Sequence, residues 1–122
     1  MILLPLIDEM PQILAALAPV PGVAAVHEGW PKTFEQLPCI AVEEAGNTPT
    51  DFRDDKAYVT ELEYTVRVFA VKAEEKRAIA SAIEGTDDEP GPLPAMGYTR
   101  TFSWDDDSAD VRQKVMRYKK IL

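Results

Sequence analysis

The sequence predicts an α+β fold, in which a mainly antiparallel sheet of about four to five strands packs against two helices. A stretch near the middle alternates apolar and polar residues with a period of two, which indicates a strand with one face toward solvent. Two other stretches, residues 6–18 and 73–84, carry apolar side chains at helical spacing. Two helices are too few to cover both faces of a parallel sheet, so we expect antiparallel pairing.

The first part of the chain predicts one helix and two strands. The helix over residues 6–18 has acidic residues near its start, where they favour the helix dipole, and it ends at Pro19. Residues 23–27 are compatible with a short strand. Residues 39–44 are rich in β-forming side chains and predict a buried strand that contains Cys39 as a small core residue.

Residues 47–56 predict a long exposed hairpin loop, because turn-forming and charged residues surround one large apolar side chain, Phe52. Such a segment does not offset the entropy of its own ordering. We therefore expect it to be disordered or raised off the body, and to become ordered against a neighbouring subunit. The interface residues predicted here are Asp51, Phe52, Arg53, Asp54 and Asp55.

The alternating stretch ends at Ala70 and is followed by the second helix, over residues 73–84, which Gly85 stops. Residues 86–95 are rich in Asp, Glu, Pro and Gly, and we expect them to form an irregular, mobile connection. Residues 111–122 predict a final strand that pairs back as a hairpin, with a short amphipathic helix as the alternative.

The strand before that hairpin is predicted to turn an aromatic face toward the core. Tyr98, Phe102 and Trp104 lie at alternate positions, and Asp105 to Asp110 then form the turn. The predicted centre of the core joins the long strand, the second helix and this strand through Leu62, Tyr64, Val66, Val68, Ile79, Ile83, Phe102 and Trp104.

Length and charge exclude several classes of protein. With 122 residues, the chain is expected to form one domain over 1–122. A net charge of -8 argues against binding to nucleic acid phosphates, which requires clustered Lys and Arg. The apolar opening is interrupted by Pro5 and Asp8 before a signal or a membrane span is complete, so we expect an intracellular protein.

The residues that carry chemistry are few, so we expect no enzyme and no cofactor. There is no glycine-rich phosphate loop, no nucleophile elbow and no paired-histidine zinc motif, and His27 is the single histidine. The run from Asp105 to Asp110 lacks the glycine and the distal Glu of a calcium loop. We interpret both aspartate clusters, at 51–55 and at 105–110, as solvated turns rather than as metal sites.

Several segments together resemble phage tail completion proteins of the tail terminator, or tail-to-head joining, family. The likeness rests on an N-terminal helix, the motif Pro21-Gly22-Val23-x-x-Val26, the strand Leu37-Pro38-Cys39-Ile40-Ala41-Val42, a long loop, the junction Phe69-Ala70-Val71-Lys72-Ala73-Glu74 between strand and helix, and a closing strand ending in Arg117-Tyr118-Lys119. The acidic segment from Thr86 to Ala95 is longer than the family pattern. No residue of the match is catalytic.

The resemblance implies a structural virion protein of the phage neck, assembled in the bacterial cytoplasm. Its subunits would form a ring, usually a hexamer, that caps the tail tube and joins it to the head-completion or connector protein. DNA would pass through the lumen without specific binding, and Asp105, Asp106 and Asp107 are predicted to face that lumen, where like charge repels phosphate. The alternatives are a small intracellular protein-binding adaptor or regulatory domain and a carboxylate-based hydrolase.

Overall fold

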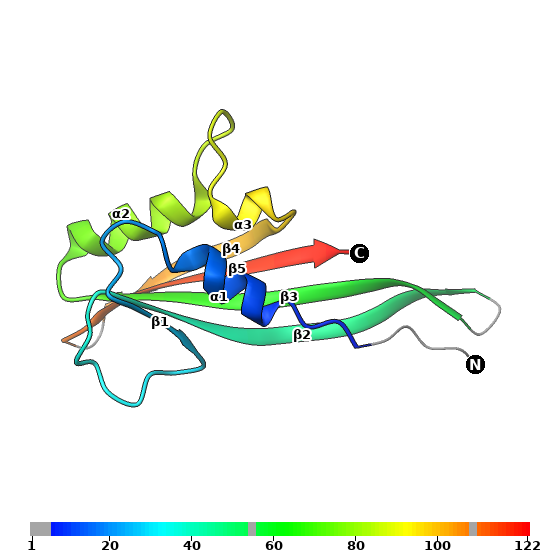
Figure 1. Cartoon of the computed structure of the whole chain (residues 1–122), viewed down its shortest axis with the longest axis horizontal. Helices are drawn as coiled ribbons and strands as arrows, with labels where there is room; N and C mark the ends of the chain where they lie inside the picture. Colours follow the sequence, from blue (N-terminus) through cyan, green and yellow to red (C-terminus); the bar gives the residue numbers. More distant parts are fainter. Residues whose placement is uncertain (1–5, 54–55, 108–109) are drawn as a thin grey trace.

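The computed structural model of the chain describes residues 6–53, 56–107 and 110–122 and contains one five-stranded sheet (Figure 1). The strand order is β1-β2-β3-β5-β4, and only the β1–β2 pair is parallel. The strands are β1 (Ala25–Glu28), β2 (Cys39–Arg53), β3 (Lys56–Ala70), β4 (Thr99–Asp106) and β5 (Arg112–Ile121). The predicted α+β class and the final strand at 111–122 are therefore confirmed.

In the described part of the chain, three helices lie on one face of this sheet (Figure 1). They are α1 (Met10–Leu17), α2 (Ala73–Glu84) and the short α3 (Pro92–Ala95), of which the sequence predicted the first two. Helix α2 ends because Gly85 adopts a φ of 71°, a left-handed conformation that favours glycine. Among the described residues, no helix has the length and apolar character needed to cross a membrane.

The core lies between the helices and the inner face of the sheet. Leu62, Tyr64, Val66 and Val68 alternate along β3 toward the helices, as their period of two predicted, and all are buried. From the helices, the core receives the side chains Met10, Ile13, Leu17, Ile79, Ile83 and Leu93. This part of the predicted core is confirmed.

A loop covers part of the outer, helix-free face of the sheet. The rings of Trp30 and Phe34 pack against Phe69 of β3, with centroid distances of 5.3 and 5.0 Å. Under this cover lie Cys39 and Ala41 of β2, both buried. The loop contacts the side of the sheet that carries β1, β2 and β3.

The predicted hairpin loop at 47–56 is wrong for its described residues, because 47–53 belong to β2 and Lys56 begins β3. The described residues of β2 and β3 pair continuously out to Arg53 and Lys56. Beyond Glu61, the last β3 residue opposite β5, the two strands form a ribbon that projects past the C-terminal end of β5 (Figure 1). Ladder hydrogen bonds satisfy the backbone of the ribbon without requiring apolar side chains, which explains why the composition resembled a loop.

The predicted inner aromatic face of β4 is also wrong. Tyr98 is buried and donates a hydrogen bond to Glu9 at 2.7 Å, but Phe102 and Trp104 are 43% and 42% exposed. The register shifts between Arg100 and Phe102, so the residues after the shift move to the other face of the sheet. Phe102 and Trp104 consequently lie on the outer face.

Candidate functional site

Three of the five predicted interface residues fall at the far end of the ribbon. Asp51, Phe52 and Arg53 are in β2, and Phe52 and Arg53 pair with Ala57 and Lys56. Asp54 and Asp55 lie outside the described residues. The segment is thus raised off the body as the sequence predicted, but as a paired ribbon rather than as a loop (Figure 1).

The second predicted cluster, Asp105 to Asp107, surrounds a buried lysine that the sequence analysis did not single out. Lys76 of α2 is 3% exposed, and its Nζ lies 2.9 Å from an oxygen of Asp105 and 2.9 Å from one of Asp107. Lys114 lies 3.6 Å from Asp105, and Arg112 lies 3.5 Å from Asp107. These contacts join the first turns of α2 to the β4–β5 hairpin.

These ion pairs shift the pKa values of Asp105, Asp107 and Lys76. The hydrogen bonds to Lys76 hold the pKa of Asp105 and that of Asp107 below their ordinary value of 3.8. Burial lowers the pKa of Lys76, but its hydrogen bonds to the two carboxylates outweigh burial, and the net pKa is raised above 10.5. Asp105 and Asp107 are exposed to solvent, as the interpretation of this cluster as a solvated turn predicted, but both also form ion pairs with a buried lysine, and Asp105 belongs to β4 rather than to a turn.

The remaining titratable candidates do not form a common site. Burial raises the pKa of the Cys39 thiol. Glu43 accepts a hydrogen bond from Arg67 at 2.9 Å and lines a hollow of about 410 Å³, whereas His27 lines a different hollow beside Trp30. In the described part of the chain, no group of three or more His, Cys, Asp and Glu side chains is placed to hold a metal ion.

A surface of aromatic and cationic side chains, which the sequence analysis missed, lies on the outer face of β4 and β5. We call Phe102, Trp104 and Arg117 the aromatic–arginine patch. The two rings stack with centroids 5.2 Å apart and planes at 11°, and the Arg117 guanidinium lies 5.0 Å from the Phe102 centroid. Trp104 lies opposite the buried Val115 in the cross-strand register. The register shift in β4 creates this surface, and the alternation of the sequence gave no signal for it.

Arg117 has an unusual electrostatic setting. Its Nε is buried and has no hydrogen-bond partner among the described residues. Within the same residues, its guanidinium forms none of the ion pairs, which engage Arg67, Lys76, Arg112, Lys114, Lys119 and Lys120. An arginine that is stacked on an aromatic ring and can still donate hydrogen bonds to a carboxylate is typical of residues that dominate binding at protein interfaces.

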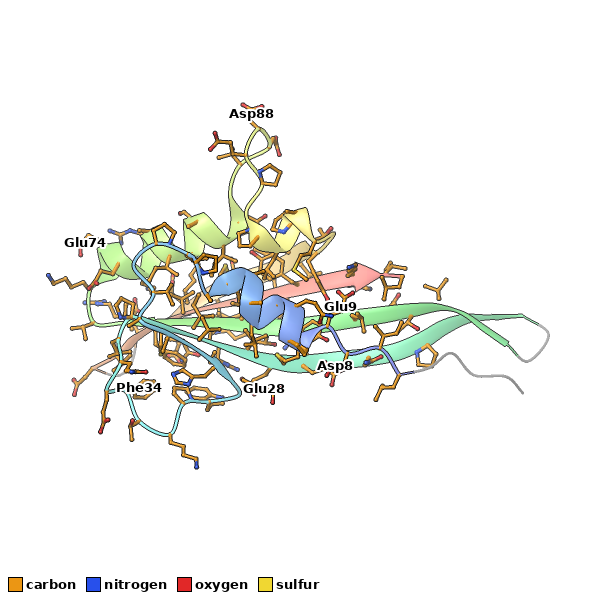
Figure 2. All side chains as sticks on the ribbon, in the orientation of Figure 1. Asp8, Glu9, Glu28, Phe34, Glu74 and Asp88 are labelled. Atoms are coloured by element: carbon orange, nitrogen blue, oxygen red, sulfur yellow. The ribbon has the colours of Figure 1, made fainter. Side chains whose placement is uncertain are left out.

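A second missed feature is the turn between α2 and α3, which we call the acidic finger (residues 86–90). It projects from the helix side of the molecule, with Asp88 near its tip (Figure 2). The Thr86 amide donates to the Glu89 carbonyl at 2.9 Å, and the Glu89 amide donates to the Thr86 hydroxyl at 3.1 Å. The base is closed by a bridge between Gly85 and Pro90. The expectation of an irregular connection over 86–95 is therefore confirmed for residues 86–90, which form a turn outside the helices and named strands, and wrong for residues 92–95, which form α3.

Two glycines make the base of the finger possible. A Cβ on Gly85 would lie 2.2 Å from the Gly91 nitrogen, and one on Gly91 would lie 2.0 Å from the Ile83 carbonyl oxygen. Only glycine permits this close backbone approach. The finger is therefore a built structure that presents three exposed carboxylates, Asp87, Asp88 and Glu89.

No model of a known protein family matches the chain, and a search of curated proteins finds no match.

Proposed function

We propose that the chain is a structural subunit of a phage neck, a tail terminator that self-assembles into a ring, caps the tail tube and contacts the head-completion complex. The observation that carries the proposal is the β2–β3 ribbon. A two-stranded ribbon is marginally stable alone in water, and a third strand or a packed partner normally supports it. The pairing of β3 with β5 ends at Glu61, and Thr60 still exchanges two backbone hydrogen bonds with Leu122; past Thr60, the described parts of β2 and β3 pair only with each other.

The resemblance of the sequence to tail completion proteins supports the same proposal. It covers the N-terminal helix, the strand that starts at Cys39 and the β3–α2 junction. In the structure the first is α1, the second is β2, and the junction leads directly from Ala70 to Ala73. A rigid sheet-and-helix body with projecting arms suits a ring subunit, whose neighbours must be contacted at fixed angles.

The proposal does not depend on an acidic lumen built from Asp105, Asp106 and Asp107. Lys76, Arg112 and Lys114 lie against two of these residues and reduce the negative potential they project. That the cluster faces the lumen stays a prediction. Its replacement by lysines is a poor test, since the change would place like charges beside the buried Lys76.

The proposal is tested by the mass of the assembly. We expect the purified chain, measured by mass photometry and by light scattering after gel filtration, to give a closed particle of roughly six copies. Negative-stain images of this particle should show a ring with a central opening. A monomer or dimer that persists at every concentration, and in the presence of purified tail tubes, would contradict the proposal and favour the adaptor alternative.

A further inference from the structure

We propose that the aromatic–arginine patch (Phe102, Trp104 and Arg117) is the docking site for the acidic finger (residues 86–90) of a second copy of this chain. The inference rests on the proposed function and names the contact that would build the ring. The patch and the finger carry opposite charges, and neither forms an ion pair with the described residues of its own chain.

The patch is an uncovered part of the sheet. The loop that carries Trp30 and Phe34 packs on Phe69, and so covers the side of the outer face near β2 and β3. At the β4 edge of the same face, Phe102 and Trp104 remain more than two-fifths exposed. Exposed stacked aromatic rings beside an arginine form a surface that gains by excluding water when a partner covers it.

The charge of the patch requires an acidic partner. Arg117 lies over the Phe102 ring, and the residue as a whole is only partly buried, so that a carboxylate can meet its exposed part. The buried Nε lacks an acceptor within the described chain. A carboxylate docked on the exposed part of Arg117 would supply the missing counter-charge without contacting the buried Nε.

The finger offers that carboxylate in a preorganised form. Asp87, Asp88 and Glu89 are exposed, and among the described residues none of them forms an ion pair. Hydrogen bonds across the turn and the Gly85–Pro90 bridge hold the backbone before any partner binds. A preorganised segment loses less conformational entropy on binding than a mobile one.

The two surfaces point in opposite directions, which determines the symmetry of the contact. The finger projects from the helix side (Figure 1). Phe102 and Arg117 lie on the other, helix-free face, because the β5 side chains of the core, Met116 and Tyr118, point to the helix side. A finger of one copy therefore reaches the patch of the next in a head-to-tail arrangement. Contacts of this kind propagate into closed rings or open filaments rather than two-fold dimers.

Charge reversal on each side tests the contact. One variant carries Arg117→Glu, and a second carries Asp87→Lys, Asp88→Lys and Glu89→Lys. Each alone should raise the concentration at which half of the chains assemble by at least tenfold. An equal mixture of the two should assemble again, because every finger then meets a patch of opposite charge. Matched controls on exposed positions of α2, Arg77→Glu and Glu74→Lys, should assemble like the unaltered chain.

Cross-linking gives a second measurement that does not depend on folding of the Arg117 variant. Both partners carry Cys39→Ala; one then carries Asp88→Cys and the other Thr101→Cys, on β4 beside Phe102. Mild oxidation of the mixture should produce a disulfide-linked heterodimer, whereas Val71→Cys, a 59% exposed position, should not replace Thr101→Cys.

The outcomes separate this contact from the ring itself. Rings whose mass and stability are unchanged by either charge reversal, with no cross-link, would overturn the finger–patch contact and leave the proposed function standing. Intact rings that lose only tail tube binding on Arg117→Glu would assign the patch to another partner and overturn it as well. A wild-type chain that stays monomeric would overturn both.

Discussion

Lys76 on α2 donates hydrogen bonds to both carboxylate oxygens of Asp107, at 2.9 and 3.0 Å, across 31 residues of sequence. The same Nζ lies 2.9 Å from Asp105. The lysine is almost fully buried, whereas the side chains of Asp105 and Asp107 are 49% and 34% exposed. The ammonium group therefore leaves water only because two carboxylates replace its hydration.

Replacement of Lys76 by alanine removes both the aliphatic part and the charge of the side chain, and it should destabilise the fold. We expect Lys76→Ala to lower the thermal unfolding midpoint by about 4 °C or more, because the variant leaves a cavity and removes from two carboxylates their nearest counter-charge, so that only Arg112 and Lys114 remain beside them. Lys76→Met keeps most of the packing and should lose less. Scanning calorimetry measures both, with Arg77→Ala on the exposed side of α2 as the control. Equal midpoints for all variants would show that the ion pairs contribute nothing to stability.

The same cluster should make stability depend on pH in acid. The folded pKa values of Asp105 and Asp107 are lowered, so their stabilising contribution is present above the unfolded value near 3.8 and is lost as pH falls through the lower folded values. Urea midpoints should therefore fall more steeply below pH 4 in the wild type than in Lys76→Met. Parallel curves would contradict the assignment.

At alkaline pH, the contribution of Lys76 to stability should be lost as pH rises, whereas that of the two aspartates is lost as pH falls. Its folded pKa is raised, so its stabilising contribution is complete below 10.5 and is lost as pH rises through the folded value. The same comparison of urea midpoints between the wild type and Lys76→Met, extended above pH 10, checks this part of the prediction.

Replacement of Val66 by Asp should prevent folding. Val66 is fully buried at the centre of β3, and an unpaired buried carboxylate costs several kcal/mol against a total stability of about 5–15 kcal/mol. The matched control is Val71→Asp, which introduces the same group at a 59% exposed position beyond the end of β3. Circular dichroism and soluble yield measure the outcome, and a cooperatively folded Val66→Asp chain would mean that the inner face of β3 is assigned incorrectly.

The first helix should depend on contacts made by Glu9. Its carboxylate accepts hydrogen bonds from Tyr98 at 2.7 Å and from Lys120 at 3.0 Å, and its amide donates to the Tyr64 hydroxyl at 3.2 Å. We expect Glu9→Gln to speed hydrogen exchange in α1 while α2 stays protected, since α2 does not use this residue. Lys119→Met, on the neighbouring position that pairs with Glu61, serves as the control. Unchanged exchange in α1 would show that apolar packing alone holds this helix.

Shortening the ribbon should abolish assembly without unfolding the domain. Residues 50–59 can be replaced by Asn-Gly, which suits a two-residue hairpin turn between the paired Pro49 and Thr60. The thermal midpoint should change little, since the core lies elsewhere, whereas the particle of roughly six copies should disappear. In the full-length chain, amide exchange in the ribbon should slow on assembly. A shortened chain that still forms rings would remove the ribbon from the interface.

The sequence by itself determined the elements that have one apolar and one polar face. The period of two in β3 and the helical spacing in α2 identified the inner faces of both, because burial of apolar side chains imposes those periods locally. The final strand and the α+β class followed from the same patterns. The lack of a metal or nucleophile motif in the sequence predicts that the chain works through binding surfaces, and the assignment of residues 51–55 and 105–107 to such surfaces stays a prediction.

Only the tertiary structure decided where the candidate surfaces lie. The ribbon is extended through backbone pairing, which the turn-forming composition of residues 47–49 does not indicate. One register shift after Arg100 turned Phe102 and Trp104 outward, and no local preference signals which strand position carries the extra residue. The two aspartates that pair with Lys76, Asp105 and Asp107, lie outside α2 and far from it in the sequence. Each of these features depends on pairing between distant segments, whereas sequence periodicity reports only which side of its own element a residue occupies.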